Sequence, residues 1–225
     1  MAIPAIKPYA MPTTARSVAP WTPDPRRAAL LIHDMQRYFV DRFPAGQPPV
    51  VELLANVAAL RDAAHAAGIP VVYTAQPGVQ GRPERGLLLD LWGPGMRADP
   101  AERGIVPALA PRPGDTVLTK SRYSAFHRTD LAGVLARAGR DQLVVCGVYA
   151  HLGCLLTACD AFSRDIEVFL VSDAVADFDA ARHAMALEYA ARSCAVTMSA
   201  RRLLAHLRAR PAREGAARAR PGAPR

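Results

Sequence analysis

Residues 29–39 read ALLIHDMQRYF, an apolar run that stops abruptly on a histidine and an acid. The apolar run at 28–32 contains no alternating polar residues, which is typical of a strand buried on both faces of a parallel sheet. Asp34 follows the run almost at once. Open α/β sheets bind ligands beyond the carboxyl ends of their strands, so Asp34 is a candidate for chemistry. The alternative is that Asp34 only caps the next helix.

Five further apolar runs predict strands, and amphipathic or Ala-rich stretches between them predict helices. The predicted strands are 69–74, 116–118, 142–146, 166–171 and 195–198, and the predicted helices are 50–67, 130–138, 153–162, 180–192 and 200–207. This alternation predicts a three-layer α/β/α fold around a Rossmann-like, six-stranded parallel sheet. Residues 78–113 are expected to form one long irregular loop of the kind that often carries function.

The two ends of the chain differ in composition from the domain predicted at 28–207. Residues 1–27 are rich in proline and are expected to form an extended arm. Residues 208–225 are almost entirely Ala, Arg, Pro and Gly and are expected to be a disordered Arg-rich tail. Six Arg and one Glu in that tail account for +5 of the net charge of +8. The rest of the chain carries only +3, a charge that does not indicate a nucleic-acid-binding surface.

Several other function classes find no support in the sequence. No apolar run has the length of a membrane helix, and the amino end lacks the apolar core of a signal peptide, so we expect a cytoplasmic protein without a membrane partner. No glycine-rich phosphate loop follows a strand, and the histidines lack metal-ligand spacing. Cofactor and metal are therefore both expected to be absent. The four cysteines lie in apolar stretches without CxxC spacing and are interpreted as reduced core thiols.

The residues just past the predicted strands form a set with complementary chemistry. In a parallel sheet these residues meet at one edge, where an acid, an amide, an ammonium and a phenol suit a small anionic molecule. The set consists of Asp34, Gln76, Lys120, Tyr149 and Asp173.

Six motifs, in order and spacing, resemble those of the isochorismatase-like hydrolases: LLIHDMQRYF, YTAQP, LWGPGM, TKSRYSAFHR, GVYAHLGC and SDAVADF. The resemblance implies cleavage of the enolpyruvyl vinyl ether of isochorismate or 2-amino-2-deoxyisochorismate, in siderophore, phenazine or related secondary metabolism. The products would be pyruvate and a dihydro-aromatic acid. The resemblance implies no metal and no organic cofactor.

The resemblance also assigns roles to residues. Vinyl ether hydrolysis needs a general acid that protonates the methylene carbon and groups that stabilise the resulting oxocarbenium ion. Asp34 is the expected acid, and Lys120 is expected to orient it and to bind a substrate carboxylate. The pocket is expected to hold the ring and carboxylates through Gln76, Arg85 and Tyr149, with Trp92 as a wall.

Many members of this superfamily instead use a cysteine nucleophile at the position that Gly153 occupies here, and Gly153 is counted with the substrate-binding residues. A cysteine amidase using Cys154 is the alternative, although one residue along a helix turns the side chain by about 100°. His33 is expected to be a structural histidine. Ser121 stands where the resemblance predicts Trp, which leaves a non-catalytic ligand-binding relative as a further alternative.

Three more expectations come from the resemblance. A non-proline cis peptide is expected near Tyr149. A homodimer is expected, with Phe126 or its neighbours in the interface. Because the chain ends in the Arg-rich tail and not in an aryl carrier domain, the 2-amino substrate is slightly favoured.

Overall fold

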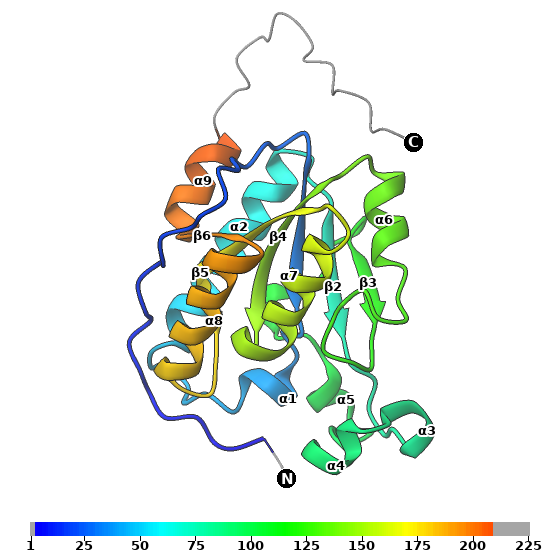
Figure 1. The fold of residues 1–225 in the computed structure, drawn as a ribbon. Coiled ribbons are helices and arrows are strands. Elements are labelled where there is room, and N and C mark those ends of the chain that lie inside the picture. Colours follow the sequence, from blue (N-terminus) through cyan, green and yellow to red (C-terminus); the bar gives the residue numbers. More distant parts are fainter. Residues whose placement is uncertain (1–2, 209–225) are drawn as a thin grey trace, which may run out of the picture.

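The computed structural model describes residues 3–208 and contains one six-stranded sheet in which every pairing is parallel. The strand order is β3-β2-β1-β4-β5-β6, so the chain starts in the middle and moves first to one edge and then to the other. The strands are β1 (Ala28–His33), β2 (Val71–Ala75), β3 (Thr116–Thr119), β4 (Gln142–Val148), β5 (Glu167–Ala176) and β6 (Val196–Met198). Figure 1 shows their carboxyl ends directed to one edge of the domain.

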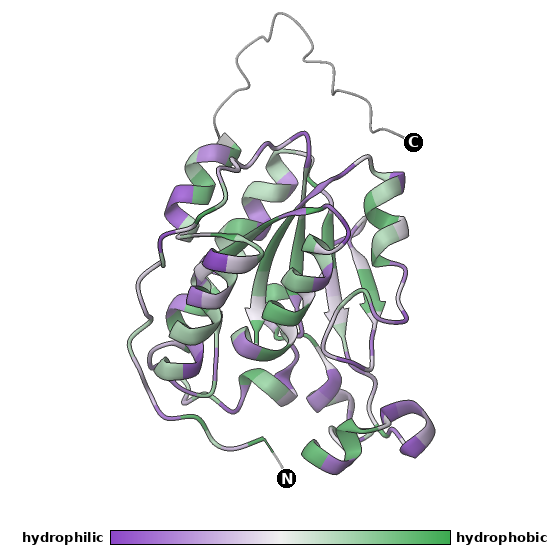
Figure 2. Ribbon diagram, viewed as in Figure 1, coloured by the Kyte–Doolittle hydropathy of each residue, from purple (hydrophilic) through white to green (hydrophobic). Residues whose placement is uncertain are grey.

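Helices cover both faces of the sheet, which confirms the predicted three-layer α/β/α fold. One face packs against α2 (Val50–Ala66) and α9 (Ala200–Arg208), and the other against α6 (Leu131–Arg137), α7 (Leu155–Phe162) and α8 (Ala180–Ser193). Leu30 and Ile32 of β1 face the first layer, while Ala29 and Leu31 face the second. Figure 2 shows that the hydrophobic residues concentrate in the strands and on the helix faces toward them.

Short helices gather where the strands end (Figure 1). They are α1 (Arg37–Val40), α3 (Arg82–Arg85), α4 (Leu88–Trp92) and α5 (Pro100–Arg103). A 3₁₀ turn, η1 (Pro107–Leu109), follows α5 and packs beside α2, where the Ala108 carbonyl accepts a hydrogen bond from Arg61. The prediction of one irregular loop over 78–113 is therefore wrong in detail. Each of these helices has three to five residues, too few to show a helical hydrophobic period in the sequence.

The fifth strand is longer than predicted, and this changes the set of strand-end residues. Val145 of β4 pairs with Leu170, but Gly147 pairs with Val175, so β5 passes through an irregularity and continues to Ala176. Asp173 consequently does not reach the edge where Asp34 lies. Its carboxylate accepts a hydrogen bond from the Ala200 backbone N–H at 2.6 Å, at the start of α9.

The amino-terminal arm is extended from residue 3 to residue 24 and lies along the domain (Figure 1). Backbone bonds attach it at Ile6, which donates to the Arg42 carbonyl, and at Val18, which donates to the Ala191 carbonyl. The predicted tail lies outside the described residues except for Arg208, which ends α9. No helix within residues 3–208 has the length and apolar character needed to cross a bilayer.

Candidate active site

A buried ion pair lies at the carboxyl ends of β1 and β3. Nζ of Lys120 is 2.7 Å from Oδ2 of Asp34, and the two side chains are 0% and 5% exposed. Lys120 also donates to the Arg122 carbonyl at 2.9 Å. The strand β2 lies between β1 and β3, and the long side chain of Lys120 spans the distance from the end of β3 to Asp34. The parallel strands bring Asp34 and Lys120 to the same edge of the sheet, as predicted.

Thr74 of β2 and Gln76, just past the end of that strand, complete the environment of Asp34. The Thr74 hydroxyl donates to Oδ1 at 2.6 Å and accepts from the Asp34 backbone N–H at 3.1 Å, while Gln76 donates to Oδ2 at 3.0 Å. Burial raises the pKa of Asp34, but the Lys120 charge and the hydrogen bonds from Lys120 and Thr74 outweigh it and hold the pKa below its ordinary value. Asp34 is therefore a carboxylate in the free protein at neutral pH.

Gln76 is itself held in place by Gln36. The Gln36 amide donates to the Gln76 carbonyl at 3.0 Å and accepts from the Gln76 N–H at 2.7 Å, and it also donates to the Arg103 carbonyl. Gln36 is almost completely buried. The side chain of Gln76 thus contacts the candidate acid, whereas the sequence assigned it to the substrate ring and carboxylates.

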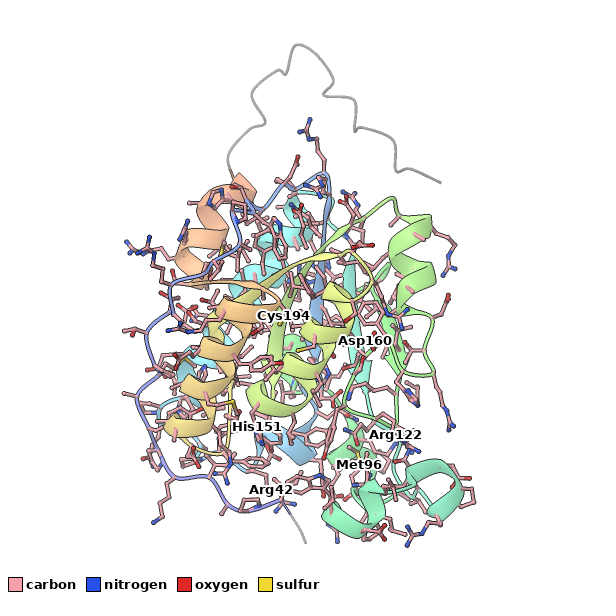
Figure 3. All side chains as sticks on the ribbon, viewed as in Figure 1. Arg42, Met96, Arg122, His151, Asp160 and Cys194 are labelled. Carbon is pink, nitrogen blue, oxygen red and sulfur yellow. The ribbon has the colours of Figure 1, made fainter. Side chains whose placement is uncertain are left out.

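A pocket of about 500 Å³, including its opening to solvent, lies over this pair. Asp34, Gln76, Arg85 and Lys120 are its polar lining residues besides tyrosines. Aromatic rings form much of the wall: Tyr38, Phe39, Trp92, Tyr123, Tyr149 and Phe178. Ile3 of the arm also lines the pocket. In Figure 3, Arg42, Met96, Arg122 and His151 lie at this end of the molecule, and Asp160 and Cys194 lie farther from it.

Tyr149 lines the pocket with its ring, but its hydroxyl points elsewhere. That hydroxyl donates to the Phe39 carbonyl at 2.8 Å, and burial raises the pKa of Tyr149 well above its ordinary value. Tyr149 was expected to help hold the substrate ring and carboxylates; its ring is placed to do so, whereas its hydroxyl proton is already donated to the Phe39 carbonyl. The expected non-proline cis peptide is confirmed, and it joins Val148 to Tyr149.

Trp92 and Arg85 both reach the pocket from the segment between β2 and β3. Trp92 forms a wall as predicted, and its indole N–H donates to the Tyr123 hydroxyl at 2.6 Å. Arg85 is 6% exposed, although an arginine in such a segment is usually solvated. Its Nε donates to the Gly93 carbonyl, which fixes the plane of the guanidinium.

Gly153 lies in η2 (Ala150–Cys154), a turn of π-helix that leads into α7. A Cβ at this position would lie 2.0 Å from Cε1 of His33, so the imidazole occupies the space that a side chain would need. His33 donates from Nδ1 to the Val148 carbonyl at 2.9 Å, and burial lowers its pKa to about 4. His33 is thus a neutral, buried structural histidine, as predicted.

Cys154 is not placed as a nucleophile. It is fully buried in the core between the sheet and α6–α8, and it does not line the pocket. Burial raises the pKa of the Cys154 thiol well above its ordinary value, which keeps it in the unreactive thiol form.

His151 pairs with an aspartate that the sequence did not indicate. Its Nδ1 lies 2.6 Å from Oδ1 of Asp177, and its backbone N–H donates to Oδ2 of the same carboxylate at 2.6 Å. Asp177 follows the extended β5, where Asp173 was expected. His151 packs against the Phe178 ring and does not itself line the pocket.

The prediction for Phe126 needs a correction of its own. Its ring is 6% exposed, packs in the core beside α6 and α7, and lies under the Arg164 guanidinium. Phe126 therefore has little apolar area to offer a partner chain, whereas its neighbours His127 and Arg128 are exposed.

Sequence reasoning missed several residues of the site. Thr74 and Gln36 lie inside the motifs YTAQP and HDMQRYF, so the signal was present but their hydrogen-bond partners were not readable. Tyr123, Leu88 and Phe178 line the pocket from loops or short helices. Within residues 3–208, no group of three His, Cys, Asp or Glu side chains is placed to hold a metal ion.

A parallel α/β sheet that carries a buried carboxylate–ammonium pair beside an aromatic pocket at its carboxyl edge is typical of enzymes that act on small molecules. The Isochorismatase domain family matches residues 28–202. The chain is 56% identical over 215 residues to isochorismatase of Bacillus subtilis, covering 94% of this chain and 69% of that protein. The chain belongs to the isochorismatase family.

Two further relatives are named for biosynthetic roles. The phenazine biosynthesis protein PhzD of Pseudomonas fluorescens is 52% identical, over 88% of this chain and 96% of its own length. Enterobactin synthase component B of Escherichia coli K12 is 49% identical, over 88% of this chain and 71% of its own length. Among solved structures, a cysteine hydrolase from Pseudomonas syringae superposes with a TM-score of 0.76 at 26% identity, over 88% of this chain and 98% of its own.

Proposed function

We propose that this protein hydrolyses the enolpyruvyl vinyl ether of isochorismate or 2-amino-2-deoxyisochorismate and releases pyruvate with a dihydro-aromatic acid. The observation that carries the proposal is the buried Asp34–Lys120 pair at an aromatic pocket whose nucleophile position is occupied by Gly153. Such a site can move a proton and stabilise charge, but it offers no thiol for a covalent intermediate. The name isochorismatase of the Bacillus subtilis relative supports the same reaction, and the name of PhzD is consistent with a role in phenazine biosynthesis.

Asp34 is the general acid in this proposal. It donates a proton to the terminal methylene carbon, which converts the enol ether to an oxocarbenium ion. Water adds to the cationic carbon and returns a proton to Asp34. The hemiketal then collapses by breaking the bond between that carbon and the ether oxygen, which stays on the ring and takes the proton of the hemiketal hydroxyl. The products are pyruvate and the ring alcohol. The aromatic walls limit access of bulk water to the cation.

Lys120 has two roles in the proposal. Two of its three N–H donors contact Asp34 and the Arg122 carbonyl, which leaves one for a substrate carboxylate. Arg85 supplies a second cation in the lining. When the anionic substrate arrives, part of the ammonium charge is neutralised, and the pKa of Asp34 rises so that the carboxylate takes up the proton that it later delivers.

The test is pyruvate release, followed by coupling to lactate dehydrogenase. Purified protein is supplied with isochorismate, with its 2-amino analogue and with chorismate, which carries the same enolpyruvyl ether but has its ring hydroxyl on another carbon. The proposal predicts stoichiometric pyruvate from at least one of the first two substrates and a much lower rate with chorismate. No pyruvate from either would refute it.

We also propose that the protein is a cytoplasmic homodimer. The edge strand β3 leaves Val117 48% exposed, next to the segment that carries Lys120 and to exposed His127 and Arg128. A two-fold contact would cover this side of the site. The cytoplasm suits the four free thiols. Light scattering that gives the mass of one chain for the active protein would contradict the dimer.

A further inference from the structure

Ser121 follows the lysine of the ion pair and replaces the tryptophan that the family resemblance predicts. Its hydroxyl accepts a hydrogen bond from Nε2 of Gln80 at 2.6 Å. Gln80 is 6% exposed and comes from the segment between β2 and α3. A buried amide in a loop is costly unless both of its ends are satisfied.

The other end of the Gln80 amide contacts the pocket arginine. Oε1 of Gln80 accepts from Nη1 of Arg85 at 3.2 Å, while Nε of Arg85 donates to the Gly93 carbonyl. The guanidinium also lies against Gly95, where an added Cβ would come within 2.6 Å of Nη1. Arg85 is thus held on two edges and along one side, and it lines the pocket.

The chemistry of the three groups fixes the orientation of the amide. Arginine can only donate, so Gln80 must present its oxygen to Arg85 and its NH₂ to position 121. A serine hydroxyl can accept from that NH₂. An indole can only donate, so a tryptophan at position 121 could not accept this bond. Ser121 and Gln80 therefore work as a pair in this chain.

Arg85 is a buried cation that lacks a carboxylate within 4 Å among the described residues. Burial lowers the pKa of its guanidinium, because the charge has lost water without gaining a counter-ion. A buried cation of this kind that faces a pocket is completed by an anion from the ligand.

We infer that Gln80, oriented by Ser121, is a positioning residue that fixes the Arg85 guanidinium for a carboxylate of the substrate. The inference rests on the proposed function for the identity of the substrate. Arg85 binds the anion in the ground state as well as in the transition state. Loss of its positioning therefore raises KM more than it lowers kcat.

The kinetic test compares four variants with wild type by pyruvate release from isochorismate. Gln80→Met removes both amide contacts at similar length, and we expect KM to rise about tenfold while kcat changes less than about threefold. Ser121→Ala should raise KM by a smaller factor. Gln80→Glu should also raise KM, because its carboxylate would pair with Arg85 and compete with the carboxylate of the substrate. Gln47→Met, at an exposed glutamine, is the matched control.

A double-mutant cycle separates positioning from general destabilisation. In an Arg85→Ala background, Gln80→Met should cause no further rise in KM. Additive effects, or an unchanged KM for Gln80→Met alone, would overturn the inference. Melting temperatures of all variants show whether each one folds.

A second readout does not depend on turnover. In side-chain NMR of the free protein, a guanidinium held on two edges rotates slowly and gives separate Nη signals, which Arg85→Lys identifies by their loss. We expect these signals to merge in Gln80→Met and Ser121→Ala but not in Gln47→Met. Separate signals in Gln80→Met would overturn the inference, even if wild type releases no pyruvate and the proposed function fails.

Discussion

Nζ of Lys120 lies 2.7 Å from Oδ2 of Asp34, so a buried ammonium holds the candidate acid in its ionised form before any substrate is present. Burial of the pair costs desolvation free energy, because both charges have lost their contact with water. It also sets a condition for catalysis. An acid that is ionised in the free enzyme must gain a proton in the complex.

The pH dependence of the rate tests this condition. The pKa of Asp34 is lowered in the free protein, so at neutral pH the free enzyme lacks the proton that the reaction uses. The value of kcat/KM should therefore fall about tenfold per pH unit as pH rises from about 5 to about 8, because kcat/KM reports the free enzyme. In contrast, kcat should stay flat up to the raised pKa of the complex. A kcat/KM that is level or rises over this range would contradict the assignment.

Gly153 should tolerate no side chain. In Gly153→Ala the new Cβ would meet the His33 ring, and we expect a loss of about 1–3 kcal/mol in the free energy of unfolding. Gly104→Ala is the control, since Gly104 has φ −61° and its added Cβ would lie 3.3 Å from the nearest atom, the Pro100 oxygen. Urea denaturation measures both variants. Equal stability of Gly153→Ala and wild type would show that the ring moves away freely.

Tyr149→Phe distinguishes the ring from the hydroxyl. The hydroxyl donates to the Phe39 carbonyl, so its removal should cost about 1 kcal/mol of stability. The ring still lines the pocket, and turnover should remain close to that of wild type. Steady-state kinetics and thermal denaturation of the same sample check both parts. A fall in kcat without a fall in stability would instead give the hydroxyl a part in the chemistry.

Thiol chemistry should leave the activity intact. Cys154 is buried with a raised pKa, whereas Cys159 is half-buried and a hydrogen bond with Cys194 lowers its pKa to about 7. Iodoacetamide should therefore label Cys159 before Cys154, as read by peptide mass spectrometry, and Cys154→Ala should keep its turnover. Inactivation that tracks a Cys154 adduct would favour the cysteine amidase alternative.

Much of the fold could be predicted because the buried strands are short, uniformly apolar runs that end on polar residues. The same logic placed Asp34, Gln76 and Lys120 together. It failed at Asp173, because the irregularity that extends β5 depends on its pairing with β4. It also did not indicate the partner of the Tyr149 hydroxyl, which is a distant backbone carbonyl. Strand periodicity predicts which way a residue faces, but the choice among hydrogen-bond partners is made by tertiary packing.

The most direct test of the central claim is pyruvate release by Asp34→Asn beside wild type. Asparagine keeps the shape of the side chain but cannot deliver the proton, so kcat should fall by a factor of about 10²–10⁴ while wild type releases pyruvate stoichiometrically. Asp130→Asn changes an exposed carboxylate with 62% exposure and serves as the control. An Asp34→Asn variant that folds and turns over isochorismate at the wild-type rate would contradict the account.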